Sequence, residues 1–288
     1  MNGCVNTLWQ KGTPARVEGA RAAETIMDYS QLKVYAETEV VVCGGGVAGV
    51  FAAIAAAQQG KRVLVIEQFG SLGGTGTNGL VLPFMTMHIT GNPQCSYVSE
   101  LVRKRLEQVN GCNADGTSFD PFLMKVVLEE LCAELGVRLL YHTVIADVIR
   151  RDGRVEAVVT ANKAGLRLVK GKMFIDATGD GDVCVLAGAD YTKGDPETGK
   201  NQPISLRYMV GGVNLTEFGA FLLSEIIRTG VKAAASFTPP ISIYASVTGS
   251  GEFTLTDVFK KAIEAGDLIE DDMLYWQAFN VPGREDTV

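Results

Sequence analysis

The chain has 288 residues, of which 47% are hydrophobic and 20% charged, so it is long enough for one large or two modest globular domains. Its net charge of −7 disfavours nucleic acid as a partner, because no basic excess is present to neutralise phosphates. The six cysteines form no C-x-x-C pair, which disfavours a metal or iron–sulfur site. No secretory signal pattern is visible, and we expect a reduced, cytoplasmic setting.

Changes in pattern divide the chain into three expected parts. Residues 1–36 have the pattern of an N-terminal arm, with a short helix over Val17–Tyr29. Residues 37–190 are expected to form an α/β domain, and residues 191–288 part of a second, α+β domain that holds a substrate.

The segment from Val40 to Glu67 has the strand, glycine turn, helix and strand pattern that binds an adenine dinucleotide. Gly44, Gly46 and Gly49 have G-x-G-x-x-G spacing. The first glycine permits a tight turn, the second lets a pyrophosphate approach the backbone, and the third lets the helix pack on the sheet. Free N–H groups at the helix start favour phosphates. Glu67 ends the second strand, where it can accept hydrogen bonds from ribose hydroxyls.

A membrane helix is the competing interpretation of this segment. The 18 residues from Val40 to Ala57 carry no charge and are nominally long enough to cross a bilayer. Three consecutive glycines near the start, and a second strand that pairs naturally with the first, argue against a span. We therefore expect no membrane contact.

The rest of the chain contains further periodic segments and turns. Asp120 is a candidate N-cap for a helix that begins with Pro121, and Gly136 is its candidate stop. The expected helices are Ser96–Gln108, Pro121–Leu135, Thr216–Arg228 and Leu255–Ala265, and the expected strands are Val137–Ile149, Val155–Thr160, Leu166–Val169, Met173–Ala177 and Ile204–Gly211.

Two elements favour a flavin dinucleotide over a nicotinamide one. The loop Gly70–Gly79 has little side-chain bulk, so its backbone can pass beside a pyrophosphate and ribityl chain; an empty glycine loop is the alternative. Phe174–Asp182 is a strand that returns a second glycine turn to the mouth of the sheet. Asp182 is expected either to bond a ribityl hydroxyl or to cap a helix over Val183–Gly188.

Several spaced motifs together resemble the FAD-dependent oxidoreductases with a glutathione-reductase-like FAD domain. The resemblance covers about residues 38 to 213 and implies a tightly bound FAD and redox chemistry on a small organic substrate. It also implies a Rossmann-like domain with a central parallel sheet, helices and a small antiparallel β-meander. The motifs are Gly44–Gly49, Leu72–Thr75, Gly79–His88, Phe119–Leu128, Gly136–Thr143, Ile175–Asp182, Ala187–Gly194 and Gln202–Leu206.

The resemblance also implies which residues of the FAD-binding domain, residues 37–190, contact the cofactor. These are Gly44, Gly46, Val47, Ala48 and Gly49 at the pyrophosphate, Glu67 and Gln68 at the adenosine ribose, Gly73, Gly74, Thr75 and Thr77 along the ribityl chain, Val144 at the adenine, and Ala177, Thr178, Gly179 and Asp182 closing the pocket.

One departure from the family pattern concerns the end of the site. Such flavoproteins close it with a second glycine–aspartate segment, and none follows Ala189 here. We expect that the chain is a truncated form, or that a homo-oligomer or a partner chain completes the site.

Two residues are candidates for the chemistry. His88 follows the Leu72–Thr75 loop and suits proton transfer near neutrality, although a structural histidine is the alternative. Arg207 can clamp a substrate carboxylate, although a surface ion pair is the alternative. His142 is expected to be structural, Gln202 to contact a ligand or form a turn, and Cys95 to have no evident base.

The expected function is hydride transfer between a small organic substrate and FAD. Two alternatives remain. The chain can be a nicotinamide-binding or thiazole-synthase-like protein without flavin turnover, or a non-catalytic FAD-domain subunit that needs a partner.

Overall fold

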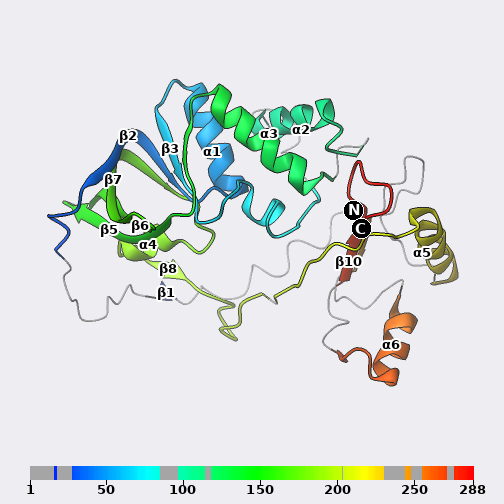
Figure 1. Cartoon of the computed structure of the whole chain (residues 1–288). Helices are drawn as coiled ribbons and strands as arrows, with labels where there is room; N and C mark the ends of the chain where they lie inside the picture. Colours follow the sequence, from blue (N-terminus) through cyan, green and yellow to red (C-terminus); the bar gives the residue numbers. More distant parts are fainter. Residues whose placement is uncertain are drawn as a thin grey trace. The chain divides into compact units, whose positions relative to one another are not determined.

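The computed structural model describes residues 16–17, 28–84, 97–113, 118–202, 204–229, 244–247, 255–270 and 276–288. It divides into two compact units (Figure 1). The first comprises Met1–Gly74 and Leu128–Ile204, and the second comprises Thr75–Val127 and Ser205–Val288. The domain boundaries expected after residues 36 and 190 stay predictions.

A six-stranded mixed sheet organises the first unit, with strand order β4-β3-β2-β7-β6-β5. The first four strands in this order are parallel, and β7, β6 and β5 form an antiparallel meander. The α/β class with a parallel core and a small meander is therefore confirmed. The strands are β2 (Val34–Cys43), β3 (Val63–Ile66), β4 (Arg138–Leu140), β5 (Val144–Arg151), β6 (Arg154–Asn162) and β7 (Gly165–Asp176).

Helices cover this sheet and connect its parallel strands. Helix α1 (Val47–Gln58) joins β2 to β3 and contacts both, α3 (Pro121–Glu134) precedes β4, and α4 (Asp182–Leu186) follows β7 and contacts β5. A two-residue strand, β1 (Arg16–Val17), pairs with β8 (Tyr191–Thr192). The uncharged residues 40–57 are therefore a strand, a turn and a helix within the globular unit.

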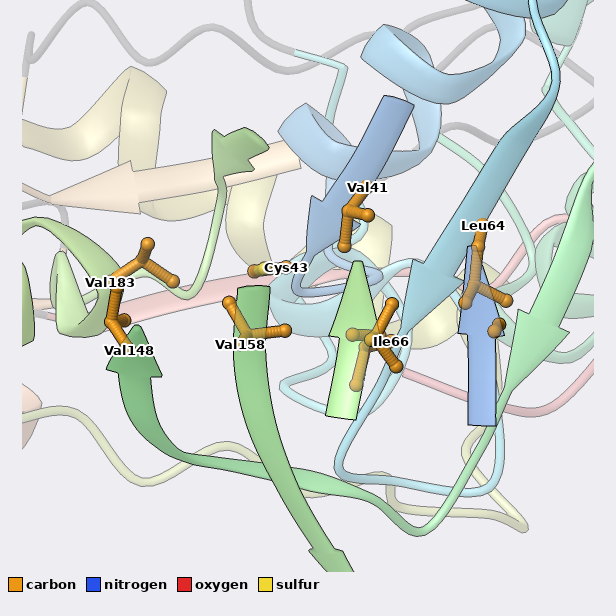
Figure 2. Packing of buried hydrophobic residues seen from close by; sticks show 9 residues of the cluster. Val41, Cys43, Leu64, Ile66, Val148, Val158 and Val183 are labelled. Carbon is orange, nitrogen blue, oxygen red and sulfur yellow. The ribbon is translucent and has the colours of Figure 1, made fainter. Parts of the chain in front are cut away.

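Both faces of β2 are buried over its carboxyl-terminal half, as expected of a central parallel strand. Val40, Val41, Val42 and Cys43 are all inaccessible to solvent or nearly so. Figure 2 shows the cluster on one face, where Val41 and Cys43 meet side chains from the neighbouring strands and from α4. Burial raises the pKa of the Cys43 thiol to about 12, so this cysteine is a core residue. The cluster holds Ala36, Val41, Cys43, Leu64, Ile66, Val148, Val158, Val169 and Val183.

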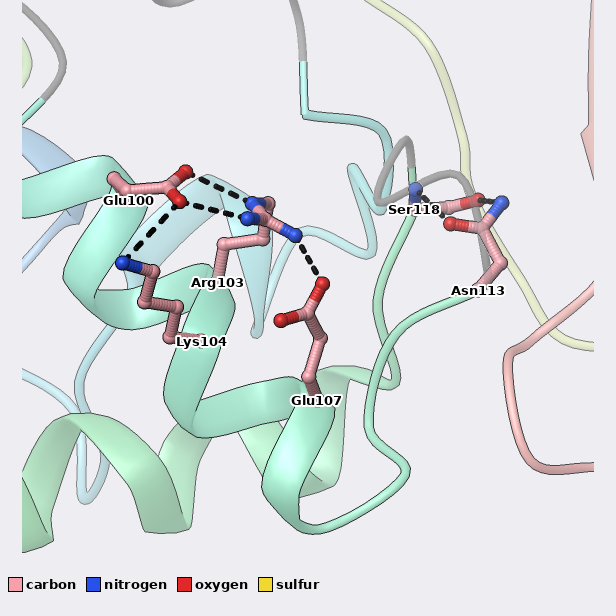
Figure 3. A network of polar contacts seen from close by, with 6 residues as sticks. All are labelled: Glu100, Arg103, Lys104, Glu107, Asn113 and Ser118. Carbon is pink, nitrogen blue, oxygen red and sulfur yellow. Dashed lines mark hydrogen bonds and ion pairs between the residues drawn. The ribbon is translucent and has the colours of Figure 1, made fainter.

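The second unit contains α2 (Tyr97–Gln108), α5 (Leu215–Thr229), α6 (Thr256–Ala265) and the antiparallel pair β9 (Tyr244–Val247) and β10 (Trp276–Phe279). Leu215, Leu222 and Leu255 form its small core. Figure 3 shows that Arg103 of α2 binds Glu100 and Glu107 of the same helix. Such exposed pairs add only a few tenths of a kcal/mol, about 0.3 to 0.5 each.

The start of α3 forms as the sequence predicts. The Asp120 carboxylate accepts hydrogen bonds from the backbone N–H groups of Phe122 and Leu123, at 2.7 and 3.0 Å, with Pro121 as the first helical residue. Arg284 also binds the Asp120 carboxylate, at 3.1 Å. The helices expected at 96–108, 121–135, 216–228 and 255–265 are all present within one residue at each end.

Several expected strands are wrong. Val137–Ile149 is interrupted, because His142 adopts a left-handed backbone conformation (φ 50°) between β4 and β5. The separate strands 166–169 and 173–177 are one continuous strand, β7, held by its register with β2. Ile204–Gly211 is not a strand; Val210 exchanges two backbone hydrogen bonds with Val288, but no ladder extends from this pair. The helix expected over Val17–Tyr29 lies mostly outside the described residues, and Val17 belongs to β1.

Candidate functional site

The carboxyl ends of the parallel strands in the first unit lie along one edge of the sheet, where doubly wound folds bind ligands. Backbone hydrogen bonds tie the segments that leave these strands to one another. The Gly44 N–H donates to the Ile66 carbonyl, and the Ala177 N–H donates to the Cys43 carbonyl, both at 2.8 Å. The two glycine turns that the sequence places 130 residues apart are thereby neighbours.

Gly44 and Gly49 are required by the packing of this turn. Gly44 has φ +101°, and a Cβ there would lie 2.2 Å from the Ala177 carbonyl oxygen. A Cβ on Gly49 would lie 1.9 Å from the Gly44 carbonyl oxygen. Both distances are shorter than real Cβ contacts, so these two glycines let α1 and the second turn approach β2.

Gly46 differs, because the packing of the described residues does not require a glycine there. Its backbone is extended (φ −65°, ψ −178°), which any residue adopts, and a Cβ would meet only the Gly74 Cα, at 4.0 Å. Packing within the described residues therefore does not explain why position 46 has no side chain. Gly46 lies at the start of α1, which has no side-chain cap and no acidic residue in its first turn. This cradle fits a diphosphate, which binds N–H groups at a helix N-terminus.

The second glycine loop reaches the same place. The Gly73 N–H donates to the Gly45 carbonyl at 2.9 Å, and Gly46 and Gly73 form a parallel bridge. A Cβ on Gly74 would lie 2.8 Å from the Gly46 Cα. The structure thus brings together Gly46, Gly73 and Gly74, as the sequence predicts for a loop that passes beside a pyrophosphate.

Glu67 is 5% exposed and holds the two loops with its carboxylate. One oxygen accepts a hydrogen bond from the Gly45 N–H at 2.6 Å, and the other accepts one from the Phe69 N–H at 2.7 Å. Each oxygen keeps a further lone pair for a ligand hydroxyl. The neighbouring Gln68 is exposed.

The start of β5 also lies beside Glu67. The Thr143 N–H donates to the Glu67 carbonyl at 3.0 Å, which places Val144, the first residue of β5, next along the same edge. His142 donates its backbone N–H to the Phe69 carbonyl, and its ring lies against Gly70. These contacts agree with a structural role for His142.

The turn after β7 is organised by Asp176, a residue that the sequence analysis did not single out. Its carboxylate accepts hydrogen bonds from the Thr178 N–H and hydroxyl, at 3.2 and 2.8 Å, and from the Cys184 N–H, at 2.8 Å. Burial opposes ionisation of Asp176, but these hydrogen bonds outweigh it and lower the pKa of the carboxyl. The signal in the sequence was an aspartate at the last position of a strand that ends in a glycine turn.

Asp182 does not cap a helix over Val183–Gly188, so that alternative is wrong. Helix α4 begins at Asp182 itself, and its N-cap residue is Gly181 with φ 74°, which has no side chain to form a cap. The Asp182 N–H donates to the Thr178 hydroxyl at 2.9 Å. Asp176 supplies the helix-start hydrogen bond instead, because the turn returns the end of β7 to the first turn of α4.

For the remaining candidate site residues, the structure gives little or no information on a contact with a cofactor. Thr75 and Thr77 belong to the second unit, and Gly179 is exposed on the turn after β7, so their contacts with a cofactor stay predictions. His88 and Cys95 lie outside the described residues. Gln202 is exposed.

Arg207 is in an irregular segment of the second unit and not on a strand. Its Nη2 donates to the Gln277 Oε1 at 3.3 Å, and its guanidinium lies over the Phe279 ring. The surface ion pair that the sequence allowed is not formed with any residue that the structure describes.

The mixed sheet with its parallel core and the glycine-lined edge define a dinucleotide-binding α/β protein. The model of the family described as "FAD dependent oxidoreductase" matches residues 39–273. The chain therefore belongs to the FAD dependent oxidoreductases, and its cofactor is FAD. The bare backbone at Gly46 and the carboxylate of Glu67 fit the diphosphate and the ribose of that cofactor.

Curated relatives match about half of the chain. It is 33% identical to the thiamine thiazole synthase of Methanococcus aeolicus over 162 residues, which are 52% of this chain and 59% of the relative. It is 34% identical to the thiamine thiazole synthase of Aeropyrum pernix over 155 residues, which are 50% and 52%. The chain thus spans little more than half the length of these relatives. The structure of THI4 from Thermovibrio ammonificans has 20% identity and a TM-score of 0.39, and covers 52% of this chain and 61% of that one.

Two features are absent from the described residues. Among them, no helix combines the length and the apolar character that crossing a bilayer requires. No group of three or more histidine, cysteine, aspartate or glutamate side chains in these same ranges is arranged to hold a metal ion.

Proposed function

We propose that the chain is an oxidoreductase that transfers hydride between a small organic substrate and FAD bound at the edge formed by β2, β3 and β7. The observation that carries the proposal is the bare backbone at Gly46. A glycine occupies a position where the packing of the described residues accepts a side chain, and it lies beside a second glycine loop at the start of a helix. Family membership supplies the flavin part of the proposal.

Each part of the edge has a role in the proposal. The N–H groups at the start of α1, at Val47, Ala48 and Gly49, hold the diphosphate. The Glu67 carboxylate, already fixed by Gly45 and Phe69, accepts the ribose hydroxyls. Val144 places its backbone against the adenine. Residues Ala177, Thr178, Gly179 and Asp182 close the pocket from the β7 side.

Bound FAD would supply the two-electron chemistry, and the chain would position the substrate and manage the proton. His88 is the proposed proton partner, since its ordinary pKa suits transfer near neutrality. Replacing it with Gln removes the proton exchange while keeping a polar side chain of similar size. The proposal expects lower turnover at unchanged FAD content, and unaltered turnover would remove His88 from the mechanism.

A second candidate is use of the dinucleotide without flavin turnover, as in a thiazole-synthase-like protein. The identity to the two thiamine thiazole synthases supports it. The matched part contains the dinucleotide edge, which many chemistries share, and so does not distinguish the two candidates.

Purification of the chain, release of any bound small molecule and its identification by mass test both candidates. The proposal expects FAD, together with the visible absorbance of an oxidised flavin that bleaches when a substrate is added without air. A released adenine dinucleotide without flavin absorbance favours the second candidate. The mass of the native particle shows whether another copy or a partner chain is needed.

A further inference from the structure

The second unit contains a cavity of about 240 Å³ that the proposed FAD edge does not use. It lies between the segment Ser205–Val210, strand β10 and helix α5. Its apolar wall includes Leu80, Leu82, Phe218 and Phe279, and its polar groups include Arg207 and Gln277. The volume equals about eight water molecules of liquid, so it suits a compact organic ligand.

Within the described part of the chain, the guanidinium of Arg207 uses only a small share of its hydrogen-bonding capacity. An arginine carries five N–H donors, and one of them reaches Gln277 at 3.3 Å. The guanidinium carbon lies 5.6 Å from the centre of the Phe279 ring, so the cation is stacked on an aromatic face. Arg207 is half-buried, and no carboxylate of the described residues pairs with it.

Three other arginines of the same unit are paired with carboxylates. Arg103 binds Glu100 and Glu107, Arg228 binds Glu225 and Asp257, and Arg284 binds Asp120. Unlike these three, Arg207 has no carboxylate partner among the described residues, and it lines an apolar cavity. An anion would stabilise such a cation, because an apolar wall displaces part of its hydration and supplies few hydrogen-bond acceptors in return.

We infer that this cavity binds a small monocarboxylate with an aromatic or branched aliphatic body, with Arg207 as the anion-binding residue. The planar guanidinium presents paired donors that match a carboxylate, while the phenylalanine and leucine side chains pack against the ligand body. Gln277, which already accepts from Arg207, holds the fork in place. The identification of this ligand as the substrate rests on the proposed function. The existence of a carboxylate-binding site at Arg207 does not.

Calorimetric titration of the full chain with phenylacetate and with its neutral analogue phenylacetamide tests the inference. We expect phenylacetate to bind at least about tenfold more tightly than the amide, the size of one charge-assisted interaction. The variant Arg207→Met should lose this preference and bind both compounds equally weakly. The matched control Lys260→Met removes a positive charge from an exposed site on α6 and should keep the preference.

Thermal unfolding and FAD content, measured on the same preparations, distinguish loss of the carboxylate site from loss of the fold or of the cofactor. Equal binding of the two compounds by the unmodified chain, binding of neither, or unchanged phenylacetate affinity in a folded Arg207→Met variant would each overturn the inference. If Arg207→Met fails to fold, Arg207→Lys, which keeps charge but not the planar fork, should bind phenylacetate severalfold less tightly. Loss of FAD with retained phenylacetate binding would contradict the proposed function and leave the carboxylate site standing.

Discussion

The backbone N–H of Gly45 donates a 2.6 Å hydrogen bond to the buried carboxylate of Glu67. This bond joins the glycine turn after β2 to the end of β3, so the group that is proposed to hold the ribose also shapes the turn that is proposed to hold the diphosphate. The same residues are therefore proposed to bind the cofactor and to stabilise the fold, and substitutions can separate the two roles.

Gly46→Ala should reduce FAD binding without harming the fold. The backbone at Gly46 is extended and its Cβ position is open, which favours alanine, but Gly46 is the N-cap of α1, where glycine is preferred over alanine. The free energy of unfolding should therefore change by less than about 1 kcal/mol. The added methyl group would occupy the proposed diphosphate site and weaken FAD binding by about tenfold or more. The ratio of visible to ultraviolet absorbance and a urea titration measure the two effects. Undiminished FAD content in Gly46→Val as well would contradict the proposed cofactor edge.

Gly44→Ala should damage both the fold and cofactor binding. The Cβ would lie 2.2 Å from the Ala177 carbonyl oxygen on a backbone with φ +101°, so the turn must move, at a loss on the order of 3 kcal/mol. Gly60→Ala is the matched control, since Gly60 also has positive φ (+73°) but no atom near its Cβ position. It should lose only about 1 to 2 kcal/mol and keep its FAD. Equal effects in the two variants would show that backbone conformation, and not the contact with Ala177, sets the result.

Glu67→Gln should destabilise the chain even before FAD is added. One of the two N–H groups that now donate to the carboxylate would face an amide NH2, with a loss of about 1.5 to 3 kcal/mol. FAD affinity should fall at the same time, because a ribose acceptor is lost. Glu37→Gln makes the same charge change at an exposed site on β2 and should alter neither quantity. Chemical denaturation of the FAD-free variants gives the answer.

Asp176→Asn should matter at neutral pH and cease to matter in acid. Hydrogen bonds to Cys184 and Thr178 lower the folded-state pKa of Asp176 below its ordinary value of 3.8. The stabilisation is therefore complete above the unfolded-state pKa and is lost as the pH falls through the lower folded-state value. We expect the variant to be about 1 kcal/mol less stable than the unmodified chain at pH 7, the size of a helix cap, with a smaller difference near pH 3. A difference that is independent of pH would contradict the role assigned to the ionised carboxylate.

The sequence by itself determined the local structure of the proposed FAD edge. The G-x-G-x-x-G turn, the acid that ends the next strand and the alanine-rich helix between them are local in sequence, and their steric demands act within about 30 residues. Helix bounds were predicted well for the same reason, since capping and 3.6-residue periodicity are local. The glycine requirements at Gly44 and Gly49 followed from spacing and are explained in the structure by two carbonyl oxygens.

Only the tertiary structure decided which distant groups meet. Pairing with β2 runs through both strands that were expected at 166–169 and 173–177, so they form the single strand β7. The same register places Asp176 next to Cys43. The Ala177 hydrogen bond to Cys43, the contact of Thr143 with Glu67 and the cavity around Arg207 each join segments that lie far apart in the sequence, so no local pattern predicts them. The segment Ile204–Gly211 was expected to be a strand from its sequence and is not one in the structure. A strand exists only where a neighbour pairs with it along its length, and pairing is a property of the folded chain.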